Sequence, residues 1–195
     1  MPLRTILNIS GGGTSFDLKG PTDSLISATV QRRGGAFSLK NEFSDSVRTV
    51  SFKMKGKSNW NVGDGGNDVN LMLNVNPRWD IHMNMGAGEA NFDLSAYKVR
   101  EFSFDGGAAA LEVKLGSLLP IADVRVKTGI ADVKLNIPTT SGCRIKAKTG
   151  LSSKEFSGFI KKADGTFETP NYSSATNKIF IFLDGGLSSF EVNRY

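Results

Sequence analysis

The sequence has few of the residues that reveal a function most directly. Its 195 residues include one cysteine, Cys143, and one histidine, His82. A single cysteine excludes an intrachain disulfide, and we expect Cys143 to be a buried structural thiol. A lone histidine with no cysteine near it in the sequence argues against a zinc site. A Ser-His-Asp or Cys-His nucleophile would have to use His82, because the chain has no other base of that type.

Long apolar runs are also missing. No stretch approaches the roughly 18 residues of a membrane span, and residues 1–6 lack the charged-then-apolar pattern of a signal peptide. The formal charge of +5 comes from scattered lysines and arginines, so we expect no nucleic-acid partner. We expect the chain itself to be soluble, with any membrane attachment provided by segments that it does not contain.

What the sequence does have is a glycine that recurs at a nearly constant interval. Gly86, Gly107, Gly129 and Gly150 are 21 or 22 residues apart, and each lies between two short runs of alternating apolar residues. A fixed period of this size, built from strand-like halves, is typical of stacked coils. Weaker copies extend the pattern in both directions. The expected corner glycines are Gly12, Gly35, Gly56, Gly86, Gly107, Gly129, Gly150 and Gly186.

The alternation predicts which side chains face the core. Val126 should point inward and Lys127 outward, because residues i and i+2 of a strand share a face. After Gly129 the apolar set resumes at Ala131, so inside and outside change phase at the glycine. We interpret each glycine as a corner with positive φ, which a residue without Cβ adopts at little steric cost.

The expected fold is therefore all-β. No window of helical length shows sustained 3.6-residue spacing. We predict a single domain over residues 1–195: a parallel β-solenoid (β-helix-like) of about eight coils of about 21 residues, each with two short strands and a glycine corner.

Two intervals exceed the period, which places insertions around residues 61–70 and 157–178. Residues 63–69 are similar to one copy of the calcium-binding nonapeptide of RTX-type β-rolls, whose sites need tandem copies. A Gly/Asn/Asp turn is the simpler interpretation of this single copy. The calcium candidates are Asp64, Asn67 and Asp68.

The second insertion contains the turn signal Asp164-Gly165 between Phe159 and Phe167, so we expect a projecting hairpin. Phe159, Phe167 and Tyr172 are candidate contact residues. They would either cap the last coils or bind a partner.

An enzymatic alternative rests on outward carboxylates. Parallel β-helices also host polysaccharide lyases and hydrolases, and Asp93, Glu112 and Lys134 could lie near one another on adjacent coils. Such a group is more often ordinary surface than catalytic. We therefore predict no enzyme, no catalytic residue and no cofactor, and we do not expect a small-molecule substrate.

Residues 124–138 are one complete strand-glycine-strand copy, and residues 163–172 lead through an Asn-Tyr loop into a closing copy at residues 178–192. These features resemble the toastrack family of bacterial adhesins and LiaF-like cell-envelope stress (cell wall-active antibiotics response) proteins. The resemblance covers residues 79–195, with a hairpin insertion at 157–178, and residues 1–78 look like divergent N-terminal coils of the same solenoid.

The resemblance implies a non-catalytic interaction module without a cofactor, related to cell-envelope sensing or adhesion through protein contacts. Its partner would be another protein or a second copy of itself, and its location would be the bacterial cell envelope. Many members carry transmembrane helices ahead of the solenoid, a pattern that this chain lacks. The alternatives are a carbohydrate-active enzyme on a β-helix scaffold and a calcium-stabilised adhesin.

Overall fold

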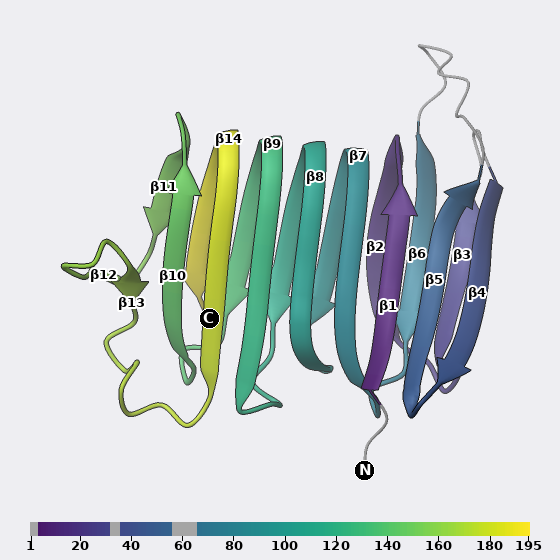
Figure 1. The fold of residues 1–195 in the computed structure, drawn as a ribbon, viewed down its shortest axis with the longest axis horizontal. Coiled ribbons are helices and arrows are strands. Elements are labelled where there is room, and N and C mark those ends of the chain that lie inside the picture. The colour runs from purple at the N-terminus through teal and green to yellow at the C-terminus, as the bar shows by residue number, and fades with distance from the viewer. Residues whose placement is uncertain (1–3, 32–35, 56–65) are drawn as a thin grey trace.

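The computed structural model describes residues 4–31, 36–55 and 66–195, which form strands joined by turns. The strands stand side by side in two facing layers (Figure 1). Long strands rise in the front layer, bend at the top and return in the back layer, so that each spans both layers as one rung. The long strands are β7 (Arg78–Leu94), β8 (Lys98–Leu115), β9 (Ile121–Ile137) and β14 (Lys178–Arg194).

Shorter strands combine to make the remaining rungs. In each combination one strand lies in the front layer and the other lies in the back layer. These combinations are β1 (Arg4–Gly11) with β2 (Thr14–Pro21), β5 (Val47–Lys55) with β6 (Asn67–Leu73), β10 (Gly142–Thr149) with β11 (Ser153–Phe156), and β4 (Ala36–Ser44) with β3 (Ile26–Gln31).

The rungs are not stacked in sequence order. The front layer runs β10-β14-β9-β8-β7-β1-β5-β4, so β14 lies between β9 and β10, and β1 lies between β7 and β5. Neighbours from β10 to β5 are parallel, whereas β4 with β5 and β3 with β6 are antiparallel. The all-β fold is confirmed, but a uniformly parallel solenoid is wrong, because antiparallel strands end the stack.

The core lies between the two layers, where inward side chains of successive rungs meet. Phe104 of β8 pairs in register with Met83 of β7 and Val126 of β9, and all three are buried. Lys127 is exposed, and after the bend Ala131 is the next buried apolar residue. The alternation and its change of phase at the glycine are confirmed. Stacking of like residues gives one continuous apolar core.

The bend explains the glycine period, but not through positive φ. A Cβ on Gly107 would lie 2.6 Å from the carbonyl oxygen of Gly86 in the neighbouring rung, and a Cβ on Gly129 would lie 2.9 Å from that of Gly107. A Cβ on Gly186 would lie 3.0 Å from the carbonyl oxygen of Gly129. Neighbouring rungs therefore approach too closely at the bend for a side chain, and that approach is what requires glycine.

The interpretation of these corners as left-handed residues is wrong wherever the structure describes them. Positive φ occurs at Gly13, beside Gly12, and not at Gly12 itself. Gly35 and Gly56 lie outside the described residues. The other expected corners, none with positive φ, are Gly86, Gly107, Gly129, Gly150 and Gly186.

The first insertion is shorter than expected. Asn67 begins β6, so residues 67–70 belong to a strand and are not part of a loop. Asn70 pairs with Asp17 of β2 and with Thr29 of β3. The alternation of Val69 and Leu71, both buried, explains why this segment is a strand.

Candidate functional site: the outer face of the front layer

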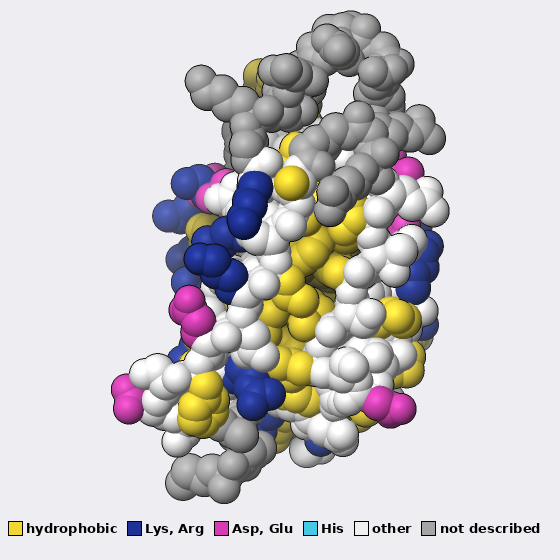
Figure 2. All heavy atoms as spheres, turned by 90° about the vertical axis from the view of Figure 1, so that its right-hand side faces the viewer, with side chains coloured by type: hydrophobic (Ala, Val, Ile, Leu, Met, Phe, Trp, Pro, Cys, Tyr) yellow, Lys and Arg dark blue, Asp and Glu magenta, His cyan; other side chains and the backbone are white. Residues whose placement is uncertain are grey.

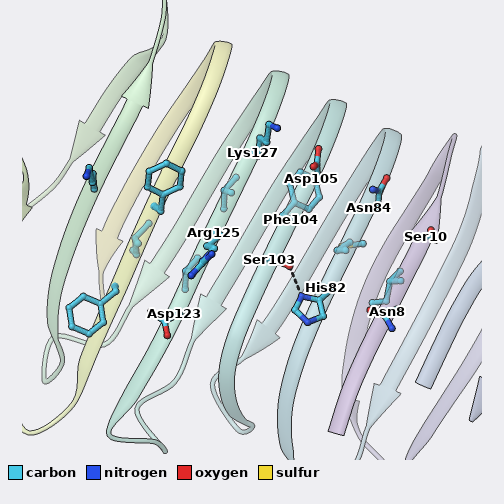
Figure 3. A pocket seen from close by; sticks show the side chains of 18 of the residues that line it. Asn8, Ser10, His82, Asn84, Ser103, Phe104, Asp105, Asp123, Arg125 and Lys127 are labelled. Carbon is cyan, nitrogen blue, oxygen red and sulfur yellow. Dashed lines mark hydrogen bonds between the residues drawn. The ribbon is translucent and has the colours of Figure 1, made fainter. Parts of the chain in front are cut away.

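The outer surface of the front layer carries a broad groove with a volume of about 1140 Å³. We call it the front groove. It reaches from Lys53 of β5, across the front strands, to Thr166 near the C-terminal end of the stack. Because the rungs are parallel and in register, outward residues at one height form a row across the groove (Figure 3).

The middle row contains the only histidine. Asn8, His82, Ser103 and Arg125 are successive register partners on β1, β7, β8 and β9. His82 Nδ1 and Ser103 Oγ are 2.6 Å apart, the contact drawn in Figure 3. Ser103 is not among the residues that we expected from the sequence. Its signal was there, because it follows His82 by 21 residues, which is one coil period.

A serine hydrolase would need more groups around the His82–Ser103 pair than the described residues place there. A serine nucleophile needs a base that a third group orients, together with donors for the oxyanion. Within residues 4–31, 36–55 and 66–195, no carboxylate is hydrogen-bonded to the His82 ring. Cys143, the only cysteine in the sequence, is buried in the core, and this burial raises the pKa of its thiol. What the structure shows for this pair is a polar contact between two rungs on the outer face.

The upper row alternates in charge. Asp105, Lys127, Asp184 and Lys148 are successive register partners on β8, β9, β14 and β10. In the part of the chain that the structure describes, no ion pair joins these side chains to one another. Their charges are therefore available to a binding partner.

The lower row contains a buried carboxylate. Asp80 of β7 is fully buried and accepts hydrogen bonds from Arg4 of β1 and from Arg100 of β8, the latter at 2.6 Å from Nη2 to Oδ2. The pairing of β7 with β8 slips by one residue at Trp79, so Arg100 is an extra residue that can reach Asp80. Removing either partner of a buried charge is costly. This cluster therefore joins β1 to β7 and β8.

The C-terminal end of the groove is built by a hairpin. β12 (Ile160–Lys161) pairs with β13 (Phe167–Glu168), and β13 pairs antiparallel with β10, so the hairpin covers the edge of β10. Gly165 has a φ of +82°, and Asp164 Oδ1 accepts a hydrogen bond from the Thr166 N–H at 3.0 Å. The turn lies where the Asp-Gly signal placed it.

The aromatic residues of this insertion pack within the chain. The Phe156 ring meets Phe167 at a centroid distance of 5.0 Å and Phe159 at 6.2 Å, both edge-on. Tyr172 packs edge-on against Phe180, and its ring lies under the Arg144 guanidinium at 4.6 Å. This arrangement favours the capping role over a free contact loop.

An ion-pair cluster fixes the hairpin to β10. Arg144 Nε donates a hydrogen bond to Glu168 Oε1 at 2.7 Å, and Lys162 Nζ lies 3.4 Å from Glu168 Oε2. The Arg144 hydrogen bond holds the pKa of Glu168 below its ordinary value, with a smaller contribution from Lys162. Arg144 also lines the front groove. The same side chain therefore anchors the hairpin and shapes the groove.

The calcium candidates do not form a described cluster. Asp64 lies outside the described residues. Asn67 is buried at the start of β6, where its N–H donates to the Gly13 carbonyl oxygen at 3.0 Å. Asp68 follows in the strand, opposite Ser15 and Gln31. Among the residues that can be described, no three or more His, Cys, Asp or Glu side chains gather to hold a metal.

The carboxylates of the enzymatic alternative lie on the back layer. Asp93 is 3.8 Å from Lys114, and Glu112 accepts a hydrogen bond from the Asn136 amide at 3.3 Å. Lys134, in register with Glu112, is 3.9 Å from Glu191. Opposite charges on adjacent rungs thus form exposed cross-strand pairs, as on an ordinary strand surface.

In the described parts of the chain, no helix is long or apolar enough to cross a bilayer. A search of curated proteins found no match to the chain. The chain superimposes on the crystal structure of a putative cell adhesion protein from Clostridium sporogenes with a TM-score of 0.92. The two sequences are 20% identical, and the superposition covers 100% of this chain and 94% of that one. At this identity the likeness shows the fold alone.

A family model described as the N-terminal domain of toast_rack, DUF2154, matches residues 4–136. The match starts in β1 and ends in β9. It includes the N-terminal rungs that the sequence presented as divergent. Since it covers more than half of the chain, the protein belongs to the toast-rack family.

Proposed function

We propose that this protein is a non-catalytic module of the cell envelope, for sensing or adhesion, which binds another protein in its front groove. Its family and the description of the Clostridium sporogenes protein support the envelope and adhesion parts of the proposal. The groove supports the choice of a macromolecule, because it crosses many strands and lies open on a sheet face. Small-molecule sites are typically enclosed clefts of about 300–1,000 Å³.

The observation that carries the proposal is an outward aromatic residue between two cations. Phe182 of β14 pairs in register with Arg125 of β9 and Lys146 of β10, and all three line the groove. Aromatic and arginine side chains dominate binding energy at protein interfaces. The adjacent Lys127 and Lys148 add positive charge on both sides of Asp184. We infer that the partner presents an acidic surface with an apolar residue that packs on Phe182.

The absence of catalysis is also part of the proposal. His82 and Ser103 are the residues most similar to a catalytic base and its nucleophile. In the described structure no carboxylate is hydrogen-bonded to His82 to orient its ring. The carboxylates of the back layer have lysine or amide partners. Hydrolysis of a chromogenic ester or a glycan by the purified protein, abolished by His82→Ala, would contradict this part.

Site-specific photo-cross-linking tests the groove. A photoreactive residue at Phe182 should capture one defined envelope protein, and the same residue at Lys134 on the back layer is the matched control. Arg125→Glu should abolish capture from position 182 without changing the melting temperature, because Arg125 is exposed. Equal capture from both positions, or capture that survives Arg125→Glu, would refute the groove as the binding site.

A further inference from the structure

The N-terminal end of the stack exposes a strand edge and the apolar interior beside it. β4 pairs with β5 on one side, and no other strand of the described residues pairs with it. Figure 2 looks at this end and shows apolar side chains running down between the two layers. Leu39 and Phe43 of β4 are 48% and 61% exposed. Unpaired backbone groups next to apolar surface favour pairing with another strand.

The register with β5 tells which side chains of β4 face inward. Leu39 lies opposite Phe52 and Asn41 lies opposite Val50, and both β5 residues are buried in the core. Lys40 and Glu42 alternate with them and therefore face outward. Phe43 is on the inward side, where Arg48 lies 5.9 Å from the centre of its ring.

We propose that the protein forms a homodimer in which β4 pairs antiparallel with β4 of a second copy, about a two-fold axis that passes at Asn41. In this register Lys40 of each copy lies opposite Glu42 of the other. Leu39 of each copy likewise lies opposite Phe43 of the other. Opposite charges and apolar pairs directly across strands both stabilise a sheet.

The charge pattern selects this register among the alternatives. Residues directly opposite one another across the two strands must have side chains on the same face of the sheet. A two-fold axis that falls between two residues would place inward residues opposite outward ones, so it is excluded. An axis at Lys40 places that lysine opposite its own copy, and an axis at Glu42 does the same for the glutamate. An axis at Leu39 makes no charge pair at all. Only the axis at Asn41 joins opposite charges, and it does so twice, as an isologous interface requires.

The geometry of the ends agrees with a second copy as the occupant. Pairing through β4 joins two front layers into one continuous sheet and brings the exposed apolar interiors of both copies together. An axis perpendicular to the sheet leaves both front grooves on the same side. Dimerisation does not depend on what the groove binds, so it can be tested separately.

Charge reversal tests the interface by sedimentation equilibrium. The wild-type protein should be a dimer, and Lys40→Glu or Glu42→Lys should each weaken it by about tenfold or more, since both pairs become repulsive. The double variant Lys40→Glu/Glu42→Lys should dimerise again. An equimolar mixture of the two single variants should form a heterodimer. A monomeric wild-type protein at the highest soluble concentration, or a dimer that none of these changes affects, would overturn the proposal.

A disulfide trap tests the register and does not depend on the charge variants. Asn41→Cys places two thiols opposite one another on the axis, within the distance that a disulfide spans. Mild oxidation should give a covalent dimer, to which the buried Cys143 does not contribute. Ser38→Cys is the control, because its copies lie far from the axis and should stay unlinked. Linkage of Ser38→Cys in preference to Asn41→Cys would overturn the assigned register.

Discussion

The two ends of the stack differ in how their strand edges and apolar interior are covered. At the C-terminal end the β12–β13 hairpin covers the edge of β10, and Phe156, Phe159 and Phe167 close the apolar interior. At the N-terminal end β4 and β3 terminate their layers, and Leu39 and Phe43 remain exposed. A repeat protein must cap both ends of its core to stay soluble. One end is thus closed within the chain, and the dimer that we propose would close the other.

Both ends are attached to a central stack whose core lies between the two layers. Val126→Asp places a carboxylate in the core between Phe104 and Leu183 and should prevent folding, because an unpaired buried charge costs several kcal/mol. Lys127→Asp, one residue away and exposed, should change the free energy of unfolding by under about 0.5 kcal/mol. Circular dichroism and urea denaturation measure both. Equal effects would refute the assignment of the core.

The bend should be intolerant of side chains in the central rungs and tolerant at Gly12. Gly129→Val should cost about 1–3 kcal/mol, because its Cβ would lie 2.9 Å from the Gly107 carbonyl oxygen. Gly12→Ala meets no atom within 4 Å and should be nearly neutral. Thermal melts of the two variants give the comparison. A neutral Gly129→Val would show that the rungs can separate at the bend.

The aromatic cap should contribute more than its exposed counterpart at the other end. Phe167→Ala removes the ring packed on Phe156 and should cost about 1–2 kcal/mol, with new self-association through the uncovered edge of β10. Phe43→Ala, measured under dilute conditions, should cost under about 1 kcal/mol. If both substitutions cost the same, the two ends do not differ in the way that we describe.

The smallest expected effect is a pH dependence that arises at the capped end. The pKa of Glu168 is lower in the folded protein than its ordinary value of 4.5, because Arg144 donates a hydrogen bond to its carboxylate. This contact stabilises the fold fully above about pH 4.5, and its contribution is lost as the pH falls through the folded value. Glu168→Gln should flatten the acid side of the plot of melting temperature against pH. An acid limb that Glu168→Gln leaves unchanged would contradict the role of this ion pair.

The sequence predicts the rung itself well, because its signals are local. Alternation around Gly129 identifies the inward residues and the change of phase, and Asp164-Gly165 identifies the hairpin. The spacing of 21 residues between His82 and Ser103, which equals one coil period, also indicated that they lie side by side. The prediction of positive φ at the corner glycines was wrong because close approach between rungs also favours glycine. The sequence does not distinguish these two causes.

The order of the rungs was not predictable from the same signals. Every rung places similar Ile, Val, Leu and Phe side chains in the core. The apolar pattern alone therefore fits β14 or β10 beside β9 almost equally well. Specific contacts distinguish the neighbours, and they join residues far apart in the sequence. Asp80 meets Arg4 and Arg100 from two other strands. Such a contact becomes visible only once the topology is known.

The place of β14 has a consequence for the order in which the C-terminal rungs form. Because β14 lies between β9 and β10, these two strands, consecutive along the chain, are not paired with each other in the front layer. Until β14 inserts, the edge of β9 is open and β10 has no front-layer neighbour except the hairpin. A folding intermediate without β14 therefore exposes two strand edges, which favour aggregation. Insertion of this one rung closes both edges in a single step.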